Sequence, residues 1–242
     1  MKIAGADTIL RAVTNPLKNN YLVRGVWGLT GVVALAGCSK PHATTPTPTA
    51  PLPTAGIAAQ AVSVLPLTLL AADDSLHWAA ALGARRAALT KADSVLGTLL
   101  KERAPEVTWV LPDELRRAAR RAPGIAPDPD QMGTALLFHA EKLALVPDPL
   151  RGELRTLAAL AGSGGGRYAL VPAGLIFRKP EPAGPRAPPG PGPHGAGTAE
   201  LTVVMVDVRT GHIGFRTVAR GEGDDPWAAL TRAVKSLTPG LP

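Results

Sequence analysis

The sequence contains one cysteine, Cys38, among 242 residues. A single thiol excludes a framework of disulfides within the chain, and it excludes a metal site built from several cysteines. A membrane-spanning helix needs about 20 apolar residues, and the uncharged apolar run over residues 25–36 is shorter than that. We therefore expect neither a disulfide within the chain nor an apolar helix long enough to span a membrane.

The sequence also lacks the spacings that are typical of catalytic and metal sites. Asp74 and His77 are three residues apart, but no third ligand lies near them, which favours a surface polar pair over a metal site. The glycine-rich run 162–166 lacks the Gly-Lys-Ser/Thr ending of a phosphate-binding loop, so it is better explained as a flexible loop. No serine, histidine and acid occur in the setting of a nucleophile elbow. We expect no catalytic residue, no metal and no cofactor.

The cysteine lies in the most informative motif of the chain. The sequence Leu35-Ala36-Gly37-Cys38 ends the apolar run, and Arg24 precedes that run. This order is typical of the lipobox of a bacterial secretory signal peptide, in which the cysteine thiol receives a diacylglycerol before cleavage in front of it. The mature protein would begin at a lipidated Cys38. A buried core cysteine and an uncleaved anchor helix are the alternatives.

Lipidation of this kind places the rest of the chain outside the cytoplasm. Ser39, the second residue of the mature chain, is a neutral residue of the kind that permits transfer to the outer membrane, so we predict a lipid-anchored protein at the outer membrane that faces the periplasm. The formal net charge of the whole sequence is +7. Export argues against nucleic acid as a partner, and it leaves anionic lipid, lipopolysaccharide and peptidoglycan as acidic ones.

Composition divides the chain into three parts. Residues 1–37 form the predicted signal peptide, and residues 38–56, rich in proline and threonine, form a predicted tether with too few large apolar residues to fold. Residues 57–242 form one predicted periplasmic domain, with a loop rich in proline and glycine at about 178–198.

The hydrophobic pattern of the domain alternates between strands and helices. Pro66 is expected to end the pairing of the first strand, and Asp225 and Pro226 are expected to begin the last helix. We expect strands over 61–65, 107–111, 168–177, 201–208 and 213–218, and helices within 76–103 and over 112–121, 131–145, 149–161 and 227–237.

A cluster of four arginines, Arg116, Arg117, Arg120 and Arg121, is a candidate binding surface. On a helix these residues form two adjacent rows four residues apart, where like charges repel unless a partner neutralises them. The simpler interpretation is a solvated face that Asp113 and Glu114 partly compensate. The functional interpretation is docking to lipid phosphate, a peptidoglycan carboxylate or an acidic protein.

The last two strands are joined by a turn that contains Asp207, Arg209, Thr210 and Gly211. A glycine in this place supplies the positive φ that a tight hairpin requires. Asp207 and Arg209 could act as a functional pair, but turns favour aspartate for its local hydrogen bonds, so a structural role is preferred.

This turn and the order of the elements resemble the TolB amino-terminal-like, CsgG-related domain of bacterial outer-membrane lipoproteins. The resemblance implies an α/β fold, with a small mixed sheet of about four to five strands packed with helices, and a role in envelope assembly or secretion. No pair of long alternating segments suited to transmembrane β-hairpins is present, which argues against a secretion pore. We predict a lipoprotein that binds an envelope protein partner without catalysis. The alternative is a lipoprotein that binds a small molecule or glycan, and an envelope hydrolase is a more distant one.

Overall fold

The computed structural model describes residues 51–161, 166–180 and 196–238. The chain divides into two units, residues 1–44 and 45–242, and all described residues belong to the second. The predicted signal peptide 1–37, with Leu35, Ala36 and Gly37, and the predicted lipidation site Cys38 lie outside the described residues. No helix among the residues described is long and apolar enough to span a membrane.

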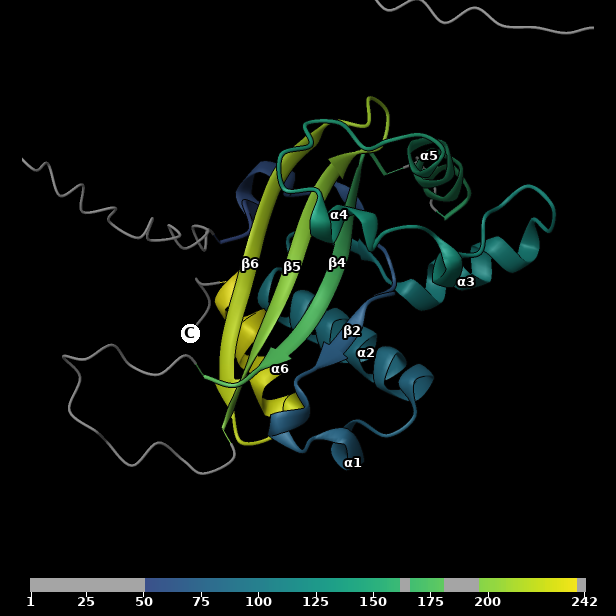
Figure 1. Ribbon diagram of the computed structural model, residues 1–242. Helices are drawn as coiled ribbons and strands as arrows, with labels where there is room; N and C mark the ends of the chain where they lie inside the picture. The colour runs from purple at the N-terminus through teal and green to yellow at the C-terminus, as the bar shows by residue number, and fades with distance from the viewer. Residues whose placement is uncertain (1–50, 162–165, 181–195, 239–242) are drawn as a thin grey trace, which may run out of the picture. The chain divides into compact units, whose positions relative to one another are not determined.

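The described unit is an α/β fold with one mixed sheet, as predicted (Figure 1). Its strands are β1 (Ala61–Val64), β2 (Leu70–Ala72), β3 (Thr108–Val110), β4 (Tyr168–Arg178), β5 (Gly197–Asp207) and β6 (Ile213–Gly223). Its α-helices are α1 (Ala79–Leu82), α2 (Arg85–Arg103), α3 (Pro112–Arg121), α4 (Leu136–His139), α5 (Leu150–Ala161) and α6 (Pro226–Leu237). Three short 3-10 helices are η1 (Thr54–Ile57), η2 (Asp74–Leu76) and η3 (Pro129–Gln131).

The strand order is β3-β1-β4-β5-β6, with β2 paired to β4 beside the end of β1. Both β1 and β2 run parallel to β4, whereas β4, β5 and β6 form an antiparallel meander. The sheet therefore has one short strand beyond the four to five that the sequence predicts. The extra strand is β2, and a break in the chain's strand pairing separates β1 from β2.

The break between β1 and β2 has a clear cause in the sequence. Pro66 has no N–H to donate to a neighbouring strand, and β1 ends at Val64, as predicted. The chain rejoins β4 when the amide of Leu175 donates to the carbonyl of Leu69. Opposite the break, the register of β4 against β5 shifts between Pro172 and Gly174. Pro66, which follows β1, and Pro172, which lies within β4, thus interrupt the strand pairing at the same place.

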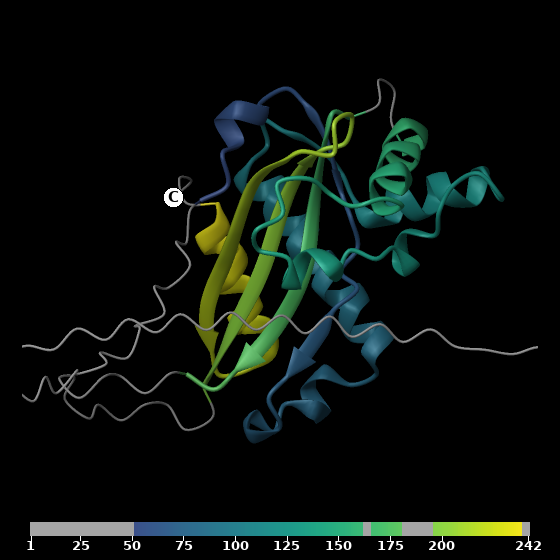
Figure 2. The ribbon, with the colours of Figure 1, turned by 45° about the horizontal axis from the view of Figure 1, so that its top comes forward.

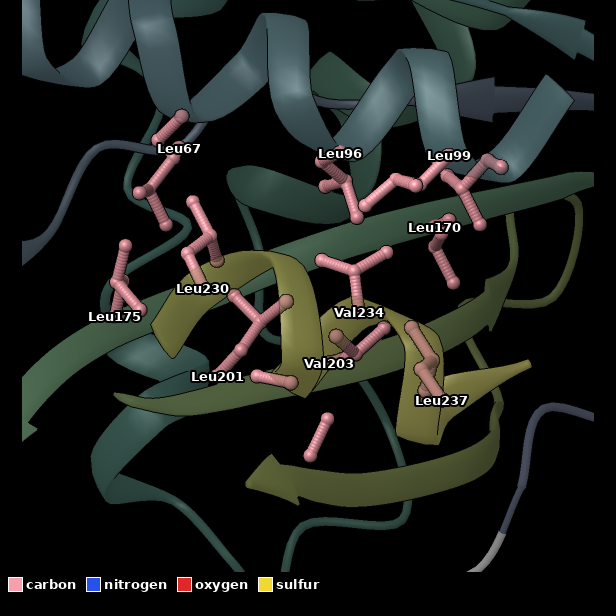
Figure 3. Packing of buried hydrophobic residues seen from close by; sticks show 14 of the residues in the cluster. Leu67, Leu96, Leu99, Leu170, Leu175, Leu201, Val203, Leu230, Val234 and Leu237 are labelled. Atoms are coloured by element: carbon pink, nitrogen blue, oxygen red, sulfur yellow. The ribbon is translucent and has the colours of Figure 1, made fainter. Parts of the chain in front are cut away.

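Helices cover both faces of the sheet and enclose two hydrophobic cores. Leucines and valines of α2, α6 and β5 pack together on one face, as Figure 3 shows for Leu96, Leu230 and Val203. On the other face, Leu115 of α3 and Leu154 of α5 belong to a second core. In Figures 1 and 2, α2 and α6 lie behind the sheet, and α3 and α5 lie to its right.

Several predicted boundaries shift in the structure. The predicted tether 38–56 overlaps the folded domain, because Leu52 is buried and its amide donates to the carbonyl of Leu237. The loop predicted at 178–198 is shorter at both ends, since β4 continues to Arg178 and β5 begins at Gly197. Residues 181–195 of that loop lie outside the described residues.

The helix predicted over residues 131–145 is wrong. Only the four residues of α4 and the last residue of η3 are helical there. The guanidinium of Arg216 donates to the carbonyls of Leu137 and Ala140, at 2.6 and 3.0 Å, and the amide of Ile213 donates to the carbonyl of Ala144. Bonds to β6 thus satisfy backbone groups that a helix would otherwise use.

The close approach of α6 to β6 depends on Gly221. A Cβ at this position would lie 2.2 Å from the amide nitrogen of Ala233 and 2.5 Å from the carbonyl oxygen of Ala229. Both atoms belong to the backbone of α6, so they cannot move aside as a flexible side chain would. The helix can therefore pack at this distance only over a glycine.

We expect Gly221→Ala to destabilise the domain by about 1–3 kcal/mol, which is typical of overpacking. Gly214→Ala is the matched control, because Gly214 also lies in β6 but has no atom within 4 Å of an added Cβ. Chemical denaturation of both variants measures the free energy of unfolding. Equal stability of the two variants would contradict the close packing of α6 on β6.

Candidate functional site

The arginine cluster lies on α3, which the second core holds in place. Pro112 occupies the first turn of the helix, where its missing N–H costs no hydrogen bond, and it is buried together with Leu115 and Ala118. The carboxylates of Asp113 and Glu114 lie in the first turn, where they complement the helix dipole. One face of α3 therefore packs on the domain, and the arginines occupy the rest of its surface.

The structure separates Arg116 from the other three arginines. Its guanidinium is only 17% exposed and forms ion pairs with three carboxylates. The closest oxygens belong to Asp93 at 2.7 Å, Asp130 at 2.7 Å and Asp113 at 2.9 Å. Two of its nitrogens bind the Asp130 carboxylate. Arg116 thus joins α2, α3 and η3 and is not a freely available docking group.

Asp93 is the buried member of this network. Its carboxylate is 5% exposed, and Oδ1 accepts a hydrogen bond of 2.8 Å from the amide of Leu67. That amide belongs to the break between β1 and β2, so α2 supplies the acceptor that the break needs. Burial raises the pKa of Asp93 to about 6, although the bonds from Leu67 and Arg116 favour the ionised form.

The other three arginines of the cluster are exposed. Arg117 donates from Nε to the carbonyl of Asp113, and among the described residues no carboxylate pairs with Arg117, Arg120 or Arg121. The acids expected to compensate the cluster are used elsewhere: Asp113 binds Arg116, and Glu114 lies 3.8 Å from Lys101. Three uncompensated cations therefore remain on the outer surface of α3.

A groove of about 930 Å³ lies beside these arginines. It runs between α2, α3 and the segment 126–131, and residues of both signs line it. Arg86 of α2 and Arg120 of α3 line the groove, and Asp128 and Asp130 line it from the segment 126–131. Arg85 also lines the groove. Its guanidinium donates to the carbonyl of Thr68 at 3.0 Å and thereby stabilises the segment between β1 and β2.

The turn predicted at Asp207 has a structural role of its own. Oδ1 of Asp207 accepts from the amides of Arg209 and Thr210, and Gly211 has a φ of 78°. Its Oδ2 accepts from Nε of Arg167 at 2.8 Å. Burial acts to raise the pKa of Asp207, but these hydrogen bonds outweigh it and lower the pKa below its usual value.

The remaining candidates from the sequence form no larger site in the part of the chain that is described. His77 ends η2 with a φ of 54°, and its backbone N–H donates to the carbonyl of Asp74. No three His, Cys, Asp or Glu side chains among the described residues come together in a way that could hold a metal. Residues 162–165 of the glycine run lie outside the described residues.

Sequence reasoning missed Asp93 and Asp130. Asp93 had a recognisable signal, because it lies on the apolar stripe of α2 that also carries Leu89, Leu96 and Leu100. A lone acid on such a stripe indicates a buried, paired carboxylate. Asp130 had none, since its approach to Arg116 depends on the path of the loop after α3.

Replacing Asp93 by asparagine should reveal the raised pKa. As pH falls from 7.5 to 4.5, native Asp93 takes up a proton before the unfolded chain does. The wild type should therefore gain stability relative to Asp93→Asn as pH falls, and lose it as pH rises through about 6. The gain is roughly 1.4 kcal/mol for each pH unit by which the native and unfolded pKa values differ.

Denaturation of the two proteins at several pH values measures this difference. Asp113→Asn, which removes an exposed partner of the same guanidinium, controls for the loss of an ion pair at Arg116. A stability difference between wild type and Asp93→Asn that stays constant over this range contradicts the raised pKa.

Comparisons with known proteins identify no family. No protein-family model and no curated protein matches the chain, so the TolB amino-terminal-like resemblance stays a prediction.

Three solved structures are similar: the C-terminal domain of LpoB from Salmonella enterica, a PelC dodecamer from Paraburkholderia phytofirmans, and E. coli LpoB determined by NMR. Their identities are 17%, 12% and 14%, and their TM-scores are 0.33, 0.34 and 0.35. The matches cover 69%, 81% and 92% of this chain and 83%, 93% and 96% of the other chains. Because all three TM-scores are below 0.5, these similarities carry no inference about function.

Proposed function

We propose that this chain is a lipid-anchored lipoprotein of the outer membrane, whose periplasm-facing α/β domain binds a protein partner in envelope assembly or secretion without catalysis. The observation that carries the binding role is the outer surface of α3, where Arg117, Arg120 and Arg121 are exposed and lack carboxylate partners among the described residues. The lipobox Leu35-Ala36-Gly37-Cys38 supports the anchor.

An acidic protein surface is the partner that fits α3 best. Three like charges within two helical turns repel one another, and an acidic partner relieves this repulsion when it binds. Guanidinium groups also bind carboxylates through two parallel hydrogen bonds, which gives specificity as well as attraction. Charge complementarity of this kind speeds association and weakens as salt is added.

The ion-pair network keeps this surface in shape. Arg116 fixes α3 to Asp93 of α2 and to Asp130 of η3, so the exposed arginines project from a helix held at several points. A rigid surface loses less conformational freedom when a partner binds. The internal and external arginines of one cluster thus have complementary roles.

The anchor has a direct test. Cys38→Ala removes the thiol that would carry the diacylglycerol. We expect wild type to incorporate labelled palmitate and to sediment with outer-membrane fractions, and the variant to lose both properties. Label retained in the variant, or wild type found in soluble fractions, would contradict the lipobox interpretation.

The docking surface can be tested by crosslinking in intact envelopes, followed by pull-down. We expect the triple variant Arg117→Gln/Arg120→Gln/Arg121→Gln to lose at least tenfold of the crosslinked partner, because its three uncompensated charges are removed and Arg116 is kept. Raising the salt concentration before crosslinking should weaken the wild-type signal in the same direction.

The matched control is Lys142→Gln/Arg209→Gln/Lys235→Gln. These three cations are also exposed, and no ion pair involves them among the described residues, so the control removes the same charge away from α3. The control should keep the partner. Equal loss in both triple variants, or no loss in either, would exclude α3 as the docking surface.

A further inference from the structure

A second hollow lies at the opposite face of the sheet from α3, near the turn between β5 and β6. Its volume is about 620 Å³, within the range of small-molecule sites, and its mouth is open to solvent. Residues from η1, the start of β4 and the β5–β6 hairpin line it. Figure 2 shows η1 in dark blue beside the upper end of the sheet, not far from this turn.

The floor of the hollow is apolar and comes from three adjacent strands. Met205 and Phe215 are partners in the β5–β6 register, and Tyr168 of β4 is paired with Asp207, two residues further along β5. These side chains pack against the first core on their inner side. Ile57 of η1 adds an apolar wall. A ring or a short alkyl body would find hydrophobic contact on this floor.

The polar groups of the hollow are gathered at Arg167. Its Nε binds Asp207 at 2.8 Å, and its guanidinium lies 5.2 Å from the ring centre of Tyr168. Among the described residues, neither terminal nitrogen of this guanidinium has a hydrogen-bond acceptor, and the side chain is 53% exposed. The group is thus oriented by an acid and a ring, and its two terminal nitrogens remain available to donate to an anion.

The turn next to the hollow carries further cations, which lie outside its lining. Arg155 donates to the carbonyl of Arg209 in the same turn, and neither side chain has a carboxylate partner among the described residues. Thr210 and His212 also line the hollow and supply further polar groups. Among the residues that the structure describes, Asp207 is the only carboxylate that lines the hollow, and its lowered pKa keeps it ionised and bound to Arg167.

We infer that this hollow binds a small organic anion with an apolar body. The carboxylate or phosphate of the ligand binds the terminal nitrogens of Arg167, and its apolar part rests on Tyr168, Met205 and Phe215. The orientation of Arg167 by Asp207 before binding reduces the conformational freedom that the ligand must freeze. The site is separate from the arginine surface of α3 and does not depend on it.

The probe for this site is 4-phenylbutyrate, a soluble carboxylate with one ring, and its neutral counterpart is 4-phenylbutanol. Isothermal titration calorimetry on the purified full chain measures the affinity for each. We expect saturable binding of 4-phenylbutyrate, at least tenfold weaker binding of 4-phenylbutanol, and at least tenfold weaker binding of 4-phenylbutyrate to Arg167→Gln.

Arg178→Gln is the matched control for Arg167→Gln. Arg178 lies at the other end of β4, is 59% exposed and binds Glu200 from Nε at 2.9 Å, so it has the same ion-pair geometry without the hollow. It should bind the probe like wild type. Phe215→Ala tests the apolar floor and should weaken binding of the probe, with thermal unfolding confirming that the variant is folded.

Three outcomes would overturn the inference. They are no saturable binding of 4-phenylbutyrate to wild type, unchanged affinity in Arg167→Gln, and equal losses in Arg167→Gln and Arg178→Gln. None of these outcomes bears on the docking surface of α3, because the crosslinking experiment uses different residues and a different measurement.

Discussion

The fold depends on one buried carboxylate. Pro66 interrupts the strand that would otherwise run beside β4, and the amide of Leu67 is left inside the domain without a strand partner. An unpaired buried amide costs about 1–3 kcal/mol. This cost is avoided because the carboxylate of Asp93 accepts a hydrogen bond from the amide of Leu67. A buried carboxylate is itself costly, and Arg116 compensates it at 2.7 Å. The break in the sheet therefore accounts for the position of Arg116. The amide of Leu67 in the break binds Asp93 of α2, and Asp93 in turn pairs with Arg116 of α3.

These requirements explain why Arg116 differs from the other three arginines of its cluster. Arg116 satisfies Asp93 inside the domain and reaches Asp113 and Asp130 at its surface, which leaves no carboxylate of that group for Arg117 or Arg120. A helix that only needed to be soluble would alternate acids with its arginines. On α3 the acids are used to stabilise the fold, and the outer charges remain available for a partner.

Local chemistry made part of this architecture predictable. Pro66 ended β1, Gly211 took the positive φ of the hairpin, and Asp225 accepted hydrogen bonds from the amides of Trp227 and Ala228 at the start of α6. Each of these depends on a few neighbouring residues. The prediction of a helix over 131–145 was wrong because Arg216, which is distant in sequence, donates to carbonyls of this segment. The strand β2 was missed because three residues are too few to show a hydrophobic pattern. In the candidate site, the arginine rows and the nearby acid Asp113 were predictable from the sequence. The other two carboxylate partners of Arg116, Asp130 and Asp93, were not, since they lie 14 and 23 residues away in sequence.

The two proposed binding surfaces are independent of each other for a structural reason. The α3 surface rests on the core that contains Leu115 and Leu154, whereas the hollow rests on the core that contains Met205 and Ile57, on the other face of the sheet. A ligand in the hollow contacts the ends of β4, β5 and β6 and touches no residue of the Asp93 network. To influence α3 it would have to change the sheet itself, and the long antiparallel pairing of β4, β5 and β6 resists such a change. Under the two proposals, occupancy of the hollow should therefore leave docking at α3 unaltered, and an anion and a protein partner should bind at the same time.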